Sequence, residues 1–99
     1  MILRVSGDRK KLERFAAENK DLIRGIADRA DAHGVIAHRF YGGDGQIMVV
    51  DEWPDAASFE RFFEQEQPSI DPLMAQFASG EPEVTFWRKL ETYDEVGWN

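Results

Sequence analysis

The sequence contains no cysteine. This excludes disulfide bonds, thiolate catalysis and cysteine-based metal sites, and it agrees with a cytoplasmic protein. The sequence also lacks any apolar run of membrane-spanning length. Met1 leads directly into a strand-like segment, residues 2–5, without a signal peptide. We therefore expect a cytoplasmic protein with no membrane contact.

Positively charged residues are scarce in the second part of the chain. Residues 41–99 contain three Lys/Arg and thirteen Asp/Glu, whereas residues 1–40 contain nine and six, and the net charge is −7. A nucleic-acid-binding protein usually carries a basic stripe on its binding face. The charge distribution therefore predicts no nucleic-acid partner.

The length and composition indicate one globular domain. Ninety-nine residues, 42% of them hydrophobic and 12% aromatic, suffice for one modest core. We assign residues 1–91 to this domain and residues 92–99 to a C-terminal tail. The tail is acidic but contains Tyr93 and Trp98. These aromatics predict that it packs on protein surface, preferentially that of a partner subunit; the alternative is a disordered end.

Hydrophobic periodicity predicts four strands and two main helices. Apolar residues follow one stripe from Leu12 to Ala30, which predicts a single helix that Asp8 caps and that ends near Gly34. We expect strands over residues 2–5, 35–41, 47–53 and 84–90, with a glycine-rich hairpin turn at residues 42–45.

The second helix is expected to begin near Ala56 with Asp55 as its cap. Pro68 should interrupt it. A further helical segment should restart with Asp71 as cap and Pro72 at its first position.

This βαββαβ order predicts a ferredoxin-like α+β fold, with both helices on one face of a four-stranded antiparallel sheet. The other face should then be polar, but Met48 and Val50 alternate with Ile47 and Val49. A monomer would leave a broad apolar face in water. A two-fold homodimer that stacks two such sheets face to face removes this conflict.

The element order, together with the segment from Val49 to Trp53 followed by Ala57 and Phe59, resembles the dimeric α+β barrel superfamily. Within it, the chain is similar to the antibiotic-biosynthesis monooxygenase-like group. The resemblance covers nearly the whole chain. It implies two subunits that form a dimeric α+β barrel. The group includes cofactor-free oxygenases of aromatic polyketides, haem-degrading enzymes and many members with no known activity.

The pattern of the haem-degrading relatives is incomplete here. They combine a tryptophan at the end of the third strand with an asparagine on the first strand and a histidine on the second helical segment. Only Trp53 matches, because the first strand offers Arg4 and Ser6 and no histidine follows His38. We expect no haem and no other cofactor. An RNA-recognition domain shares the element order, but the third strand lacks its stacking aromatics.

The hairpin sets the expected register of the second and third strands. Pairing Tyr41 with Gln46 puts His38 opposite Val49 and Ile36 opposite Asp51. His38, Phe40, Asp51 and Trp53 then share one face of the sheet with Ile36 and Val49. In this register His38 and Asp51 are diagonal neighbours, about 7–8 Å apart between Cα atoms.

We expect His38 and Asp51 to be the catalytic residues. Imidazole gains or loses a proton near neutral pH, and Asp51 would orient it or favour its charged form. Trp53 and Phe40 are the expected contacts of a flat ligand. The alternative is a hydrogen-bonded histidine at a strand edge, with Trp53 as core filler.

Asn19 is a third expected ligand contact, because it is a polar residue on the apolar stripe of the first helix. Alternatively it lies at the edge of the stripe and bonds to backbone or water. Asp51 and Glu52 point to opposite faces of their strand and so cannot chelate one ion together. We expect no metal.

Two functions follow. The first is a small homodimer that binds a planar apolar molecule, such as a small aromatic ligand, between helices and sheet and oxidises it as a cofactor-independent monooxygenase. The second is a ligand-binding or structural dimer module without turnover. Which of them applies depends on whether His38, Asp51, Trp53 and Asn19 converge.

Overall fold

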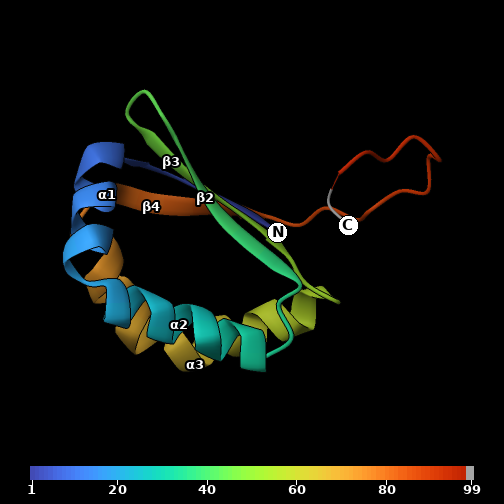
Figure 1. The fold of residues 1–99 in the computed structure, drawn as a ribbon, viewed down its shortest axis with the longest axis horizontal. Helices are drawn as coiled ribbons and strands as arrows, with labels where there is room; N and C mark the ends of the chain where they lie inside the picture. Colours follow the sequence, from blue (N-terminus) through green and yellow to red (C-terminus); the bar gives the residue numbers. More distant parts are fainter. Residues whose placement is uncertain (98–99) are drawn as a thin grey trace.

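The computed structural model describes residues 1–97. The elements, in chain order, are β1 (Ile2–Gly7), α1 (Arg9–Glu18), α2 (Lys20–Ala32), β2 (Ala37–Gly43), β3 (Gln46–Glu52), α3 (Ala56–Met74) and β4 (Ala78–Thr85). The strands form one antiparallel sheet in the order β2-β3-β1-β4. All three helices lie on one side of it (Figure 1). The predicted ferredoxin-like α+β fold is confirmed.

The single helix predicted before β2 is wrong, because the chain breaks at Asn19 into α1 and α2. Asn19 has φ −134° and ψ 44°, outside the helical region. Its Nδ2 donates to the carbonyl oxygen of Phe15 at 2.9 Å. The side chain of asparagine commonly forms such hydrogen bonds with nearby backbone groups, in competition with the backbone hydrogen bonds of a helix. The predicted cap at Asp8 is confirmed: the backbone N–H groups of Lys11 and Lys10 donate to its carboxylate and lower its pKa.

The predicted interruption at Pro68 is also wrong, since α3 continues through Pro68 and Pro72. Both prolines are exposed, four residues apart. The apolar positions on the opposite face continue past them to Leu73, which is buried. Packing of that face therefore outweighs two missing helix hydrogen bonds.

Although α3 has 19 residues, no helix within residues 1–97 is long and apolar enough to cross a membrane.

The last strand begins and ends earlier than predicted, at Ala78 and Thr85 rather than residues 84 and 90. Thr85 pairs with Ile2, the first residue of β1. The register shifts between Arg4 and Ser6, and this irregularity accommodates Pro82 on an edge strand.

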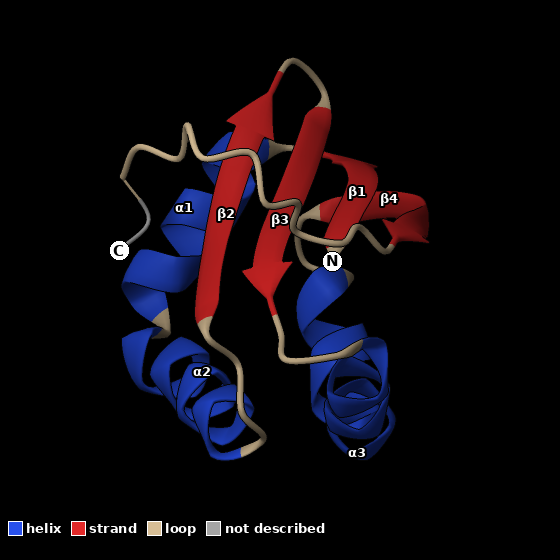
Figure 2. Cartoon of the chain, turned by 90° about the vertical axis from the view of Figure 1, so that its right-hand side faces the viewer, coloured by secondary structure: helices blue, strands red, loops and turns tan. Residues whose placement is uncertain are grey.

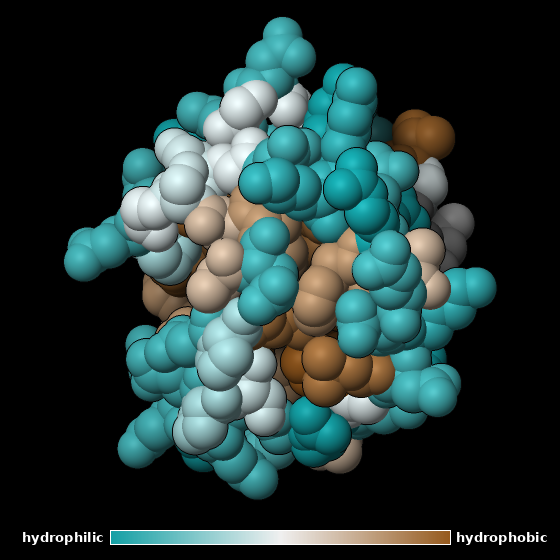
Figure 3. All heavy atoms as spheres, turned by 90° about the vertical axis from the view of Figure 1, so that its left-hand side faces the viewer, coloured by the Kyte–Doolittle hydropathy of each residue, from teal (hydrophilic) through white to brown (hydrophobic). Residues whose placement is uncertain are grey.

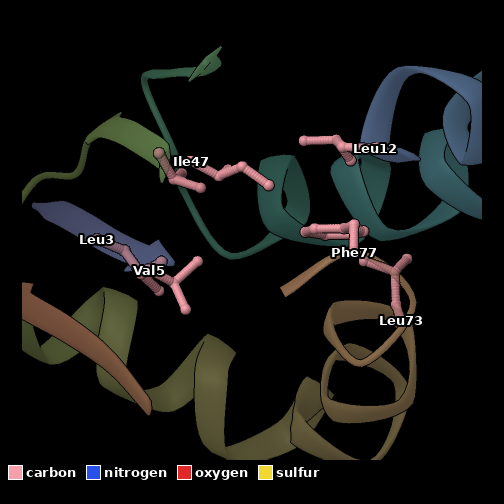
Figure 4. Close-up of a cluster of buried hydrophobic side chains, with 7 residues drawn as sticks. Leu3, Val5, Leu12, Ile47, Leu73 and Phe77 are labelled. Atoms are coloured by element: carbon pink, nitrogen blue, oxygen red, sulfur yellow. The ribbon is translucent and has the colours of Figure 1, made fainter. Parts of the chain in front are cut away.

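The core lies between the sheet and the helices. Side chains that alternate along β1 and β3 point into it, as expected for strands with one covered face. The buried cluster is Leu3, Val5, Leu12, Ile47, Val49, Leu73 and Phe77 (Figure 4). Figure 2 shows α1 and α2 on the β2 side of the molecule and α3 on the side of β1 and β4.

The opposite face of the sheet carries no helix (Figure 1). Ile2, Met48 and Val50 lie there and are only partly buried within this chain. Tyr41 is opposite Met48 and is exposed. The predicted two-sided apolar character of the central strands is therefore present in the structure.

Candidate functional site

The β2–β3 hairpin sets the geometry of the site. Its turn is Asp44-Gly45, so Gly43 pairs with Gln46 and His38 lies directly opposite Asp51. The predicted register, in which His38 faces Val49, is wrong by two residues. Gly45 has φ +68°, a conformation that glycine adopts without steric cost. A shift of two residues leaves each side chain on the same face of the sheet, so His38 and Asp51 still share one face.

Ile36 does not join this face. It precedes β2, is exposed, and its N–H donates to the carbonyl oxygen of Glu52 at 2.8 Å. Phe40 takes the position opposite Val49. The face therefore presents His38, Phe40, Val49 and Asp51 toward the helices.

The Asp51 carboxylate connects two aromatic side chains. Its Oδ1 lies 2.6 Å from His38 Nδ1, and its Oδ2 accepts from Trp53 Nε1 at 3.1 Å. The Asp51 side chain is 7% exposed and that of His38 is 37% exposed. An ionised carboxylate only accepts hydrogen bonds. Opposite an ionised Asp51, His38 Nδ1 is the donor, and in the neutral form of the ring Nε2 is then an acceptor.

Ring contacts hold both partners of Asp51 in place. The ring centroid of His38 lies 5.2 Å from that of Phe40, at an interplanar angle of 87°. Trp53 packs against Phe59 and Phe62 of α3, at 5.9 and 5.4 Å between centroids. Contacts of this kind favour defined ring orientations. The three side chains thus form one ordered unit, the His38–Asp51–Trp53 network.

A cavity of about 440 Å³ lies between the sheet and the helices and includes His38 and Asp51 in its wall. Its volume is within the range of roughly 300–1,000 Å³ that is typical of small-molecule sites. Its apolar lining residues are Leu3, Ala16, Ile23, Ile26, Ala27, Ala30, Phe40, Val49, Phe62, Phe63, Ile70, Leu73 and Met74. The charged and polar ones are Lys20, Arg24, His38, Arg39 and Asp51. Apolar atoms also reach the surface between polar residues on the side of the molecule shown in Figure 3.

The predicted site residues divide into two groups. His38, Asp51 and Phe40 line the cavity, whereas Trp53 and Asn19 do not. Trp53 lies behind Asp51 and borders a separate surface hollow together with Trp87. Asn19 lies at the α1–α2 junction, bonded to backbone.

The helical side of the cavity includes three residues that were not predicted from the sequence: Ile70, Lys20 and Arg24. Ile70 lies beyond Pro68, where a break was expected. Lys20 is four residues from Arg24 and three from Ile23, and Arg24 is adjacent to Ile23, so they lie on the same side of α2. This spacing is the feature of the sequence from which their position could have been predicted.

No group of three His, Cys, Asp or Glu side chains within residues 1–97 is arranged to hold a metal ion. His38 and Asp51 would supply two ligands, and a typical protein metal site uses more than two. The expected absence of metal and of cofactor stays a prediction.

No protein-family model and no curated protein matches the sequence. Among solved structures, the crystal structure of an antibiotic biosynthesis monooxygenase is similar, with a TM-score of 0.63 and 14% identity over 91% of this chain and 96% of that one. A protein of unknown function from Nitrosomonas europaea has a TM-score of 0.57 and 19% identity, over 92% and 91% of the two chains. A dimeric ferredoxin-like protein from an uncultured marine organism has a TM-score of 0.52 and 13% identity, over 91% of this chain and 94% of that one.

These similarities extend over nearly the whole chain at low identity, so they concern the fold. The chain has the fold of an antibiotic biosynthesis monooxygenase structure and of a dimeric ferredoxin-like protein. The resemblance predicted from the element order is confirmed at this level.

The variant Trp53→Phe tests the network. It retains an aromatic ring beside Phe59 and Phe62 but removes the N–H that donates to Asp51. Because a buried carboxylate oxygen loses its donor, we expect the free energy of unfolding to fall by about 1–3 kcal/mol, measured by chemical denaturation. Trp87→Phe is the matched control: Trp87 is 73% exposed, and its indole donates to Thr85 Oγ1 at the surface. Equal losses in both variants would contradict the assigned role of Trp53.

Proposed function

We propose that this chain binds a planar apolar small molecule in the cavity between sheet and helices, with His38 as its proton acceptor. The observation that carries the proposal is an imidazole on the wall of an apolar cavity, hydrogen-bonded through Nδ1 to a buried carboxylate. Apolar pockets with a few convergent polar groups are the usual form of small-molecule sites. Phe40 offers a ring next to His38 against which a flat ligand can pack.

The proposed chemistry is cofactor-independent monooxygenation. His38 Nε2 would remove a proton from an acidic C–H or O–H group of the bound molecule, and Asp51 would stabilise the imidazolium that forms. The electron-rich anion of the substrate would then supply the electrons for dioxygen. The step balances when a methylene carbon of the substrate becomes a carbonyl: the carbon gives up four electrons, one oxygen atom enters the product as C=O, and the other leaves as water with the two methylene hydrogens. The similarity to a protein described as an antibiotic biosynthesis monooxygenase supports this reaction class.

A binding or structural module without turnover is the second candidate. The hydrogen bonds within the His38–Asp51–Trp53 network favour it, because Asp51 already has a donor on each carboxylate oxygen. Phe40, which is apolar, is the ring beside His38. In this case His38 would stabilise the fold rather than react.

His38→Ala distinguishes the two candidates. A general base typically contributes about 10²–10⁴-fold to the rate, so the variant should lose turnover or ligand binding while it retains its fold. Oxygen consumption and ligand affinity are measured together with the melting temperature. His33→Ala is the control, because His33 lies at the end of α2 and bonds to Gln65 rather than to the cavity wall. Unchanged ligand affinity with a lowered melting temperature would identify His38 as a structural residue.

We also propose that two copies associate through the open face of the sheet. Ile2, Met48 and Val50 form its apolar part, and no helix of residues 1–97 covers it. Soluble monomers rarely expose a large continuous apolar face. A similar structure described as a dimeric ferredoxin-like protein supports a homodimer.

The C-terminal tail is a further proposed contact with the partner. Past β4 the chain leaves the body of the molecule (Figure 1). Leu90, Tyr93 and Val96 are exposed there, Tyr93 to 95%. Tyr93 therefore does not pack on its own chain, and a partner surface would cover these side chains. Trp98 lies outside the described residues. The cytoplasmic location stays a prediction.

Val50→Asp tests the dimer. A carboxylate at the centre of the stacked faces would be buried without a partner, so the variant should sediment as a monomer at micromolar concentration, or fail to fold. Leu22→Asp is the control, because Leu22 is an exposed apolar residue on α2, away from the sheet face. If the unmodified protein is a stable monomer by light scattering, the proposed association is wrong.

A further inference from the structure

Two exposed positively charged side chains border the helical side of the cavity, and that of Arg24 is 70% exposed. Lys20 and Arg24 of α2 both line it. Among residues 1–97, Asp51 of β3 is the single carboxylate that lines the cavity, and its two oxygens already interact with His38 and Trp53. Apart from His38 and Asp51, the residues that line the cavity are therefore apolar or positively charged.

Lys20 and Arg24 lie one turn apart, on the same face of α2 as Ile23 and Ala27. Within residues 1–97, Lys20 has no salt-bridge partner. Arg24 uses Nε to bond Asp28 at 3.0 Å. Its terminal guanidinium nitrogens remain as donors for another acceptor.

Arg39 also borders the cavity but is a weaker candidate for the same role. It is opposite Val50 on β2, so its side chain belongs to the open face of the sheet. There its guanidinium lies 3.4 Å from the hydroxyl of Tyr41. Lys20 and Arg24 are therefore the two cations that a ligand in the cavity would meet.

We infer that the ligand of this cavity is an amphipathic acid: an apolar body with a carboxylate that Lys20 and Arg24 bind. This inference rests on the proposed function and specifies its ligand. A carboxylate complements the cations, whereas the thirteen apolar side chains of the wall complement an aromatic body. Anchoring of the carboxylate at α2 would hold the rest of the molecule beside His38, in the orientation that proton transfer needs.

Matched pairs of ligands test the inference. Naphthoic acid and naphthamide have nearly the same shape but differ in charge, and one-ring and three-ring pairs extend the series. Affinities are measured by calorimetry on the full chain. Each ion pair at a partly exposed site should favour the acid by about two- to fivefold. The preference should shrink at high salt, since such pairs are screened.

Charge variants locate the preference. The double variant Lys20→Gln/Arg24→Gln should bind acid and amide equally, with the affinity for the amide unchanged. Asp28→Asn should strengthen binding of the acid, because it frees Arg24. Lys11→Gln is the control, as it removes one positive charge from an exposed position on α1 outside the cavity wall.

The two proposals fail in different ways. If acid and amide bind equally to the unmodified protein, or if the preference persists in the double variant, the inference is wrong and ligand binding stands. If no member of the series binds, the proposed function fails, and the inference fails with it.

Discussion

The structure of the site depends on one buried carboxylate. Asp51 lies at the end of the central strand β3, where its side chain is 7% exposed. A buried charge is costly unless it is paired and hydrogen-bonded. Two aromatic N–H groups meet this requirement, one from each side. Because both bonds use specific ring nitrogens, Asp51 determines the orientation of His38 on β2 and of Trp53 beyond β3. Trp53 in turn connects the network to the phenylalanines of α3.

The cavity beside this network follows from the way in which α2 and α3 meet. Arg29 Nε donates to Glu66 Oε1 at 2.7 Å, and the Glu66 side chain is 7% exposed. Nearby, His33 Nε2 lies 2.9 Å from Gln65 Oε1. These polar contacts join the C-terminal part of α2 to the middle of α3. On another face of α2, the small residues Ala27 and Ala30 line the cavity.

The sequence was sufficient to predict the fold and the face of the sheet that carries the site. Strand alternation and the βαββαβ order determine both, and a register error of two residues left His38 and Asp51 on the same face. Helix boundaries were less predictable. Asn19 breaks the first helix through a local hydrogen bond, whereas Pro68 fails to break α3 because tertiary packing stabilises it. The break at Asn19 reflects the local hydrogen bonding of asparagine, whereas the continuity of α3 through Pro68 does not follow from local propensity. The ligand contact expected of Trp53 stays a prediction, whereas the donation of its indole N–H to Asp51 became evident only from the three-dimensional arrangement.

The central claim is that Asp51 keeps His38 in the tautomer that leaves Nε2 as a proton acceptor. NMR spectroscopy of ¹⁵N-labelled histidine tests it most directly, through the couplings between ring nitrogens and carbon-bound ring protons at a pH where the imidazole is neutral. The account predicts that His38 carries its proton on Nδ1 and that Asp51→Ala abolishes this preference. A proton on Nε2 of His38 in the unmodified protein would contradict it.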